Sequence, residues 1–134
     1  MRILSSFLLG AALIGSAVPA FAAERDTARG EAALTKALAG RVAEKPVSCI
    51  SQIGISSSQI IDGTAILYRV GSKIYVNRPR IGADSLDDDA ILVSKTQGDQ
   101  LCSLDSIRLL DQGSRFERGF VTLGDFVPYS KAPN

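Results

Sequence analysis

The segment SQIIDGTAILYRVGSKIYVN, residues 58–77, constrains the fold more than any other part of the sequence. It holds three runs rich in Ile, Val, Tyr and Thr, which are separated by Asp62-Gly63 and by Gly71-Ser72. Both dipeptides suit two-residue hairpin turns, because such turns need residues that accept a positive φ angle. The segment therefore predicts a three-stranded antiparallel meander.

A two-residue second turn would also set the pairing register of this meander. The predicted pairs are Arg69 with Ile74, Tyr68 with Tyr75, and Leu67 with Val76. Alternation gives one face the side chains of Ala65, Leu67, Ile74 and Val76. It gives the other face those of Ile66, Tyr68, Val70 and Tyr75. Both faces are largely apolar, so we expect further strands and a helix to cover them.

An Ala-rich stretch before the meander predicts one short helix. Its apolar residues at helical spacing are Ala33, Leu34, Ala37 and Leu38. Gly40 follows them, and glycine is typical just past a helix end. Pro46 disfavours helix at Lys45, so we expect the extended part of the chain to begin there.

Short apolar runs after the meander predict further strands within 90–93, 106–111, 116–123 and 125–129. Pro128 suggests that the last of these is a sheet edge, because proline cannot donate to a strand ladder. The predicted fold is therefore mainly β, of the α+β class. It is an antiparallel meander that curls into a small barrel or sandwich, with one short N-terminal helix.

The first 22 residues have the pattern of a secretory signal peptide. Arg2 precedes an apolar run, and small residues place the cleavage between Ala22 and Ala23. Cleavage removes one basic residue and no acidic one, so 15 Lys plus Arg become 14, against 14 Asp plus Glu. A neutral mature chain argues against nucleic acid or anionic lipid as a partner held by bulk charge. No cysteine directly follows the cleavage site for acylation, so we expect no stable membrane anchor. We expect a soluble protein in the periplasm or outside the cell.

The two cysteines, Cys49 and Cys102, then lie in an oxidising compartment, where such residues most often pair. The alternatives are a reactive thiol and a metal ligand. The chain has no CxxC motif and no histidine, so a Cys-His dyad or a Cys/His zinc site cannot be assembled. The pattern favours a disulfide. The expected organisation is a signal peptide (1–22), a helical segment and linker (23–47), a disulfide-stapled β domain (48–130) and a tail (131–134).

A run of carboxylates in the loop after the meander is the densest cluster of oxygen ligands. It consists of Asp84, Asp87, Asp88 and Asp89. Oxygen ligands on a loop can hold calcium, but the spacing does not match an EF-hand. A solvated loop is the interpretation that the pattern favours, and we expect neither a bound metal nor a cofactor.

A basic rim and two tyrosines offer a candidate partner surface. Arg78 and Arg80, in the sequence NRPR, can grip a carboxylate or phosphate through a guanidinium fork. Together with Arg69 and Lys73, they can equally protect a sheet edge from aggregation. Tyr68 and Tyr75 can form a protein-binding patch, although packing inside the fold is the more usual place for such a pair.

Four stretches resemble an uncharacterised family of small exported bacterial proteins, over most of residues 48–129. They are CI at residue 49, IIDGTAILYRVGSKIYVN at residue 60, LCSLDSIRLLD at residue 101 and TLGDFVPY at residue 122. Members of that family often carry a second cysteine pair, at places that correspond here to Gly82 and Val121. The chain departs from the family there, and the resemblance implies that Cys49 and Cys102 are the pair that remains. It implies neither a reaction nor a cofactor.

These observations favour a non-catalytic exported module that binds an envelope protein or small ligand through a sheet edge or a loop. One alternative is an inhibitor of an exported hydrolase, in which the loop 77–89 would enter the target's cleft. Another is an enzyme that works through carboxylates, since no histidine is present to act as a base.

Overall fold

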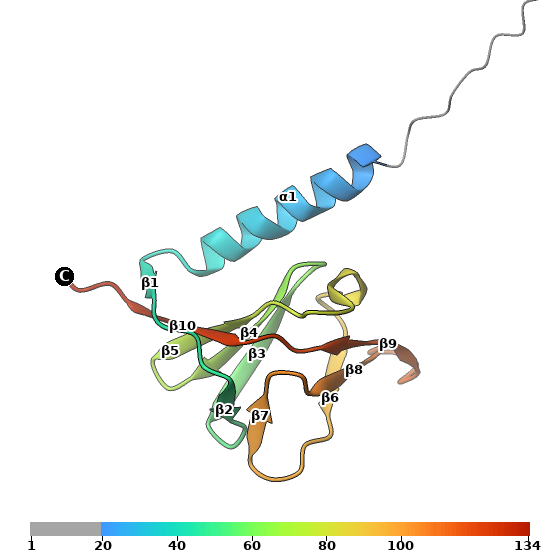
Figure 1. Cartoon of the computed structure of the whole chain (residues 1–134). Coiled ribbons are helices and arrows are strands. Elements are labelled where there is room, and N and C mark those ends of the chain that lie inside the picture. Colours follow the sequence, from blue (N-terminus) through green and yellow to red (C-terminus); the bar gives the residue numbers. More distant parts are fainter. Residues whose placement is uncertain (1–19) are drawn as a thin grey trace, which may run out of the picture.

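The computed structural model describes residues 20–134, and Figure 1 shows one helix above a set of short strands. The predicted signal peptide lies outside the described residues except for its end, and the predicted cleavage point falls in the first turn of the helix. The elements are α1 (Ala20–Ala37), β1 (Arg41–Ala43), β2 (Cys49–Ser51), β3 (Ile55–Ile61), β4 (Ala65–Val70), β5 (Lys73–Asn77), the 3₁₀ turn η1 (Ala83–Ser85), β6 (Ile91–Ser94), β7 (Gln100–Cys102), β8 (Ser106–Leu110), β9 (Glu117–Thr122) and β10 (Phe126–Lys131).

The strands form three antiparallel sheets. The largest has the order β1-β10-β5-β4-β3, a second pairs β2 with β7, and a third has the order β6-β8-β9. The sheets do not close into a barrel within the described residues. The predicted fold class is confirmed, in its sandwich-like form. The described part of the chain contains no helix that is both long enough and apolar enough to cross a bilayer.

The predicted meander is β3, β4 and β5, and the register of its second hairpin is confirmed pair by pair. Its first turn differs from the prediction, because Ile61 pairs with Ala65 and three residues lie between them. Thr64 is the extra residue: its N–H donates to Ile61 O over 3.0 Å, and its hydroxyl donates to Asp62 O over 2.9 Å. Its side chain is buried under α1, which explains why the turn is longer than the dipeptide alone suggests.

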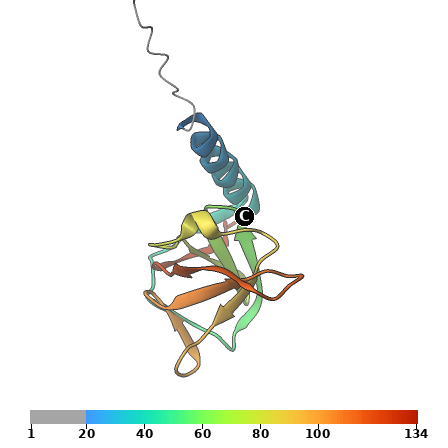
Figure 2. The ribbon, with the colours of Figure 1, turned by 90° about the vertical axis from the view of Figure 1, so that its right-hand side faces the viewer.

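Two apolar clusters lie on opposite faces of the meander, as the alternation predicted. One holds Leu34 of α1 against Ile61, Ala65, Leu67, Ile74 and Val76. The other packs Ile66, Tyr68 and Phe126 against the two smaller sheets, including Leu101, Ile107 and Leu109. Figures 1 and 2 show α1 on one side of the strands, so the helix covers one face and the smaller sheets cover the other.

The helix docks at a point where it carries no side chain. Gly30 faces the first turn of the meander, and a Cβ at this position would overlap Thr64 Oγ1. One turn later, Leu34 is only 3% exposed and fills the space above the sheet. Ala37 and Leu38 pack against the same cluster at the C-terminal end of the helix.

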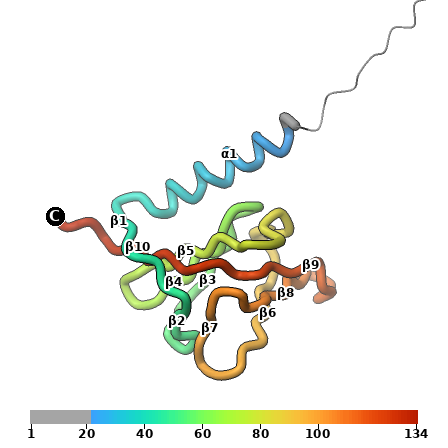
Figure 3. The backbone as a smooth tube through the Cα atoms, viewed as in Figure 1, coloured from blue at the N-terminus to red at the C-terminus, as the bar shows by residue number. Residues whose placement is uncertain are grey.

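The extended part of the chain begins earlier than Pro46, so that prediction is wrong. Arg41–Ala43 forms β1 and pairs with the last residues of β10, as the tube in Figure 3 shows. Ala132 N–H also donates to Gly40 O over 2.9 Å. The sheet thus includes residues on both sides of the predicted 48–130 boundaries. Pairing between distant parts of the chain determines this strand, because Arg-Val-Ala has no strand signal of its own.

The placement of Pro128 at a sheet edge is also wrong, because β10 lies between β1 and β5. Phe126 exchanges backbone hydrogen bonds with Val47, and Pro128 O accepts the N–H of Glu44 over 2.8 Å. The proline nitrogen therefore faces the segment 44–47, where the ladder between β1 and β10 is interrupted. The missing N–H costs nothing at such an interruption.

Candidate functional site

The two cysteines form a disulfide, which confirms that prediction. Cys49 and Cys102 lie directly opposite each other in the β2-β7 pair. The turn after β7 is held by Asp105, whose carboxylate accepts the N–H of Cys102 over 2.7 Å. Leu104 adopts a φ of 74° in this turn, a conformation unusual for a residue with a side chain. No free cysteine remains in residues 20–134, so both sulfurs serve the fold.

The residues of the predicted carboxylate cluster take part in two separate contacts that hold the loop before β6. Arg118 of β9 binds Asp87 at 2.7 Å and Asp89 at 3.2 Å, and it lies 3.8 Å from Asp111. The hydrogen bond from the Asp89 carboxyl, and then that from Arg118, lowers the pKa of Asp87 below its usual value. The neighbouring Asp87 raises the pKa of Asp89. The cluster therefore joins β9 to the loop before β6.

A hydrogen bond connects this loop to the first turn of the meander. Asp62 Oδ1 accepts the N–H of Asp88 over 2.6 Å. One oxygen each of Asp62, Asp87 and Asp88 lies within 4.8 Å of the others, a spacing that a cation can bridge. Asp87 already binds Arg118 and Asp62 already holds the loop, so each has a role without an ion.

The candidate partner surface is not a continuous patch. Tyr68 is 4% exposed and packs against Phe126 with ring centroids 5.9 Å apart, so it cannot meet a partner. Burial raises its pKa. Tyr75 is half-buried against the same core. Arg80 remains exposed, with its guanidinium 3.9 Å from Asp125.

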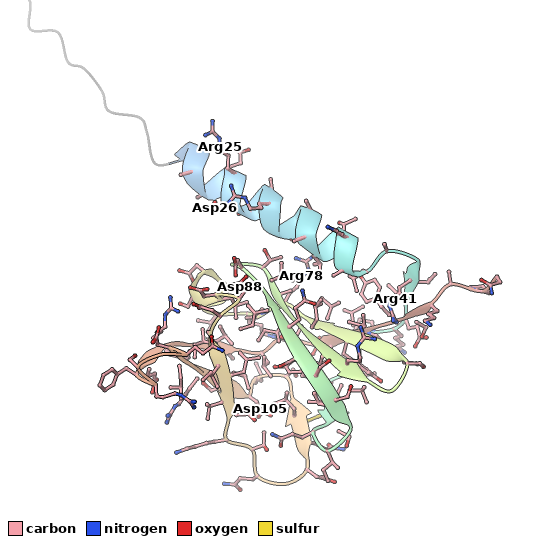
Figure 4. All side chains as sticks on the ribbon, turned by 180° about the vertical axis from the view of Figure 1, so that it is seen from behind. Arg25, Asp26, Arg41, Arg78, Asp88 and Asp105 are labelled. Carbon is pink, nitrogen blue, oxygen red and sulfur yellow. A yellow bond between two sulfur atoms is a disulfide. The ribbon has the colours of Figure 1, made fainter. Side chains whose placement is uncertain are left out.

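Arg78 has a structural partner on the helix. Its guanidinium binds both oxygens of Glu31, at 2.5 and 2.9 Å, and Figure 4 shows Arg78 between the sheet and α1. This hydrogen-bonded pair lowers the pKa of Glu31 and raises that of Arg78. Together with Gly30 and Leu34, it positions α1 over the meander.

Acid is expected to loosen this helix contact. The pKa of Glu31 in the folded protein is below its ordinary value of 4.5, so the ionised carboxylate stabilises the docked helix above that pH. The contribution disappears as the pH falls below 4.5 and through the lowered value. We expect Glu31→Gln to be less stable than the wild type at pH 7, with a smaller deficit at pH 3 because part of the Glu31 contribution is lost below pH 4.5. Urea unfolding at both pH values measures the difference, and an equal deficit at both would contradict this role.

A groove runs along α1 above β3. Two cavities of about 440 and 580 Å³ lie in it, and they share Ala33 of the helix with Gln59 and Ile61 of the strand. The floor of the groove toward β4 and β5 is apolar, formed by Leu67 and Ile74.

The strand beside the groove is a free sheet edge within the described residues. Ile61 O accepts a hydrogen bond from the Thr64 N–H, so the backbone N–H and C=O of Ile61 point toward β4. Alternation then turns the N–H and C=O groups of Ser58 and Ile60 away from β4, where residues 20–134 place no further strand. Residues 56–59 are all exposed. The edge carries no Lys and no Pro, the residues that commonly protect such strands.

The two ends of the groove carry opposite charges. At the start of β3 lie Lys36 and Arg69, and neither forms an ion pair with another described residue. The cavity at the other end is lined by Asp62, Asp84 and Asp88, and by Arg29 and Asp26 of the helix, which lie 4.0 Å apart, so its net charge is negative. Figure 4 shows Asp88 at this end, below the half of the helix that carries Asp26. Any bound chain would therefore meet a cationic and an anionic end.

The sequence patterns did not reveal this groove. They placed Asp84 and Asp88 in a candidate site, but not Asp62, Lys36 or the polar run SSSQ of β3. That run, with no charge and no proline, was the available signal of an unprotected strand. The resemblance to the exported family stays a prediction. Comparisons of this chain with protein-family models, curated proteins and solved structures found no match.

Proposed function

We propose that this protein is an exported, non-catalytic binding module that takes an extended segment of an envelope partner onto the free edge of β3. The observation that carries this proposal is an unpaired strand edge beside a groove with an apolar floor. Strand addition uses backbone groups for affinity and a neighbouring groove for alternate side chains. Both elements of such a site occur together here.

The backbone of β3 supports this mode of binding. Ser58 directs its N–H and C=O toward the open side, where an added strand finds a donor and an acceptor. Ile60 has the same orientation, but it is only 6% exposed and packs in one cluster with Leu86, so the accessible edge is centred on Ser58. The side chains of Ser57, Gln59 and Ile61 line the groove, and they would lie beside alternate side chains of the partner. The edge is short, which suits a linear segment better than a large folded surface.

The chemistry of the described side chains supports binding more than catalysis. Both thiols are joined, and the sequence has no histidine. Asp87 and Asp89, the centre of the carboxylate alternative, are engaged by Arg118. The loop 77–89, which the inhibitor alternative requires, is fastened by Arg80 N–H to Thr122 O at 2.8 Å and by Thr122 N–H to Ile81 O at 3.0 Å.

A library of random peptides displayed on phage tests the proposal directly against the disulfide-bonded protein purified after export. We expect selected peptides to slow amide hydrogen exchange at Ser58. Ser58→Pro should weaken their binding by about tenfold, since it removes one edge donor worth about 1.5 kcal/mol. The Ser58 N–H faces outward, so this change should leave the fold intact.

Ser58→Thr is the matched control, because it alters the side chain but keeps the backbone donor. It should bind selected peptides within about twofold of the wild type. Unfolding curves of both variants establish that the fold is retained. Slowed exchange only at another surface, or equal binding by Ser58→Pro, would show that the β3 edge is not the binding site.

A further inference from the structure

We infer that the segment bound on β3 runs antiparallel to it and carries a Lys or Arg followed, four residues later, by an Asp or Glu. This inference rests on the proposed function and specifies the chemistry of the partner. It is carried by the charge distribution of the groove, which is cationic at one end of β3 and anionic at the other.

The direction of the segment follows from the sheet. Every neighbouring pair in the five-stranded sheet is antiparallel, and antiparallel ladders are somewhat more stable per residue than parallel ones. A strand added to β3 in the same sense begins near Ile61 and ends near Ile55. Its first residues therefore lie at the anionic end, and its last residues lie at the cationic end.

The charges then set which residue the segment needs at each end. Asp62 directly follows Ile61, and Asp84 and Asp88 line the same cavity, so a cationic side chain is favoured there. Arg69 pairs with Ser57 across the β3-β4 ladder, and Lys36 lies above it on the helix. Two cations without an ion-pair partner among the described residues favour a carboxylate.

The spacing follows from the period of a strand. Only alternate residues of the added segment face the helix, opposite Ile61, Gln59 and Ser57 in turn. The residue opposite Ile61 and the residue opposite Ser57 are four positions apart. Between them, the position opposite Gln59 lies beside Ala33 of the helix, which borders both cavities together with Gln59, so we place a small side chain there.

Two synthetic peptides test this polarity. One has the sequence TVKTATEVT, and the other, TVETATKVT, has its two charges exchanged. We expect the first to bind the disulfide-bonded protein roughly tenfold more tightly, since two exposed ion pairs are gained. The preference should shrink as salt is raised, because exposed charges are screened. A spin label at the peptide's N-terminus should broaden the amide signals near Asp62, and one at its C-terminus those near Ser57.

The double variant Lys36→Glu with Arg69→Glu should abolish the preference. Lys95→Glu with Arg115→Glu changes the same charge outside the groove and should leave the preference unchanged. Equal binding of the two peptides, or broadening in the reverse order, would overturn the charge and direction assigned here. If library peptides still slow exchange at Ser58, the proposed function survives that result. If no peptide binds at β3, both proposals fail.

Discussion

Replacing Cys49 and Cys102 together by serine is expected to lower the free energy of unfolding by about 4 kcal/mol. The disulfide joins residues separated by 53 positions, and a loop of that length loses much of its freedom in the unfolded chain. A small domain has a net stability of only about 5–15 kcal/mol, so the loss is a large share of it. The β2-β7 pair is only three residues long, and Ile50 and Leu101 are its contribution to the buried core.

Urea unfolding of the oxidised protein, the reduced protein and the double variant measures this effect. The reduced wild type and the double variant should unfold at nearly the same urea concentration, well below that of the oxidised protein. This agreement separates the covalent bond from any packing difference between sulfur and oxygen. A difference under about 1 kcal/mol between oxidised and reduced protein would show that the staple is not a major source of stability.

Local features account for the parts of the fold that the sequence predicted. The Gly71-Ser72 turn sets the register of β4 and β5 because it joins adjacent residues, and no distant contact is needed. The alternation of apolar residues then determines both faces of the meander. The disulfide followed from the expected compartment and from the presence of only two cysteines.

Long-range pairing accounts for the parts that the sequence did not predict. The three residues of β1 become a strand only because β10, near the other end of the chain, pairs with them. The same pairing encloses Pro128 within the sheet. The first turn gains Thr64 because Gly30 of the helix lies above it, a contact between segments that no local pattern connects.

The candidate groove was invisible in the sequence for the same reason. β3 is an edge only because the meander adds β10 beside β5 and not another strand beside β3. The charges at its two ends come from the helix, from β4 and from the loop before β6. The sequence shows each charge, but only the fold places Lys36 near Arg69 and Asp62 near Asp88.

Replacing the buried Asn77 by leucine is expected to destabilise the protein by about 4 kcal/mol, because two buried backbone groups would lose their partners. The Asn77 side chain donates from Nδ2 to Gly124 O over 2.8 Å, and its Oδ1 accepts the Gly124 N–H over 3.0 Å. Asn77 is completely buried, so no water can replace it without rearrangement. The Asn77 amide thus pairs with the Gly124 backbone, between β9 and β10, as the backbone of a neighbouring strand would.

Thermal and urea unfolding of three variants separate the hydrogen bonds from the shape of this contact. Gln59→Leu makes the same amide-to-aliphatic change on the exposed edge and should alter stability by less than about 0.5 kcal/mol. Gly124→Ala keeps the amide of Asn77 but adds a Cβ that would overlap Arg78 O, so it should destabilise through displacement of the backbone. If Asn77→Leu were no less stable than Gln59→Leu, the buried amide would not hold β10 in place. We expect Asn77→Leu to lower the free energy of unfolding and also to speed amide exchange at Gly124 and Phe126. The faster exchange would show that the loss of stability arises at this contact.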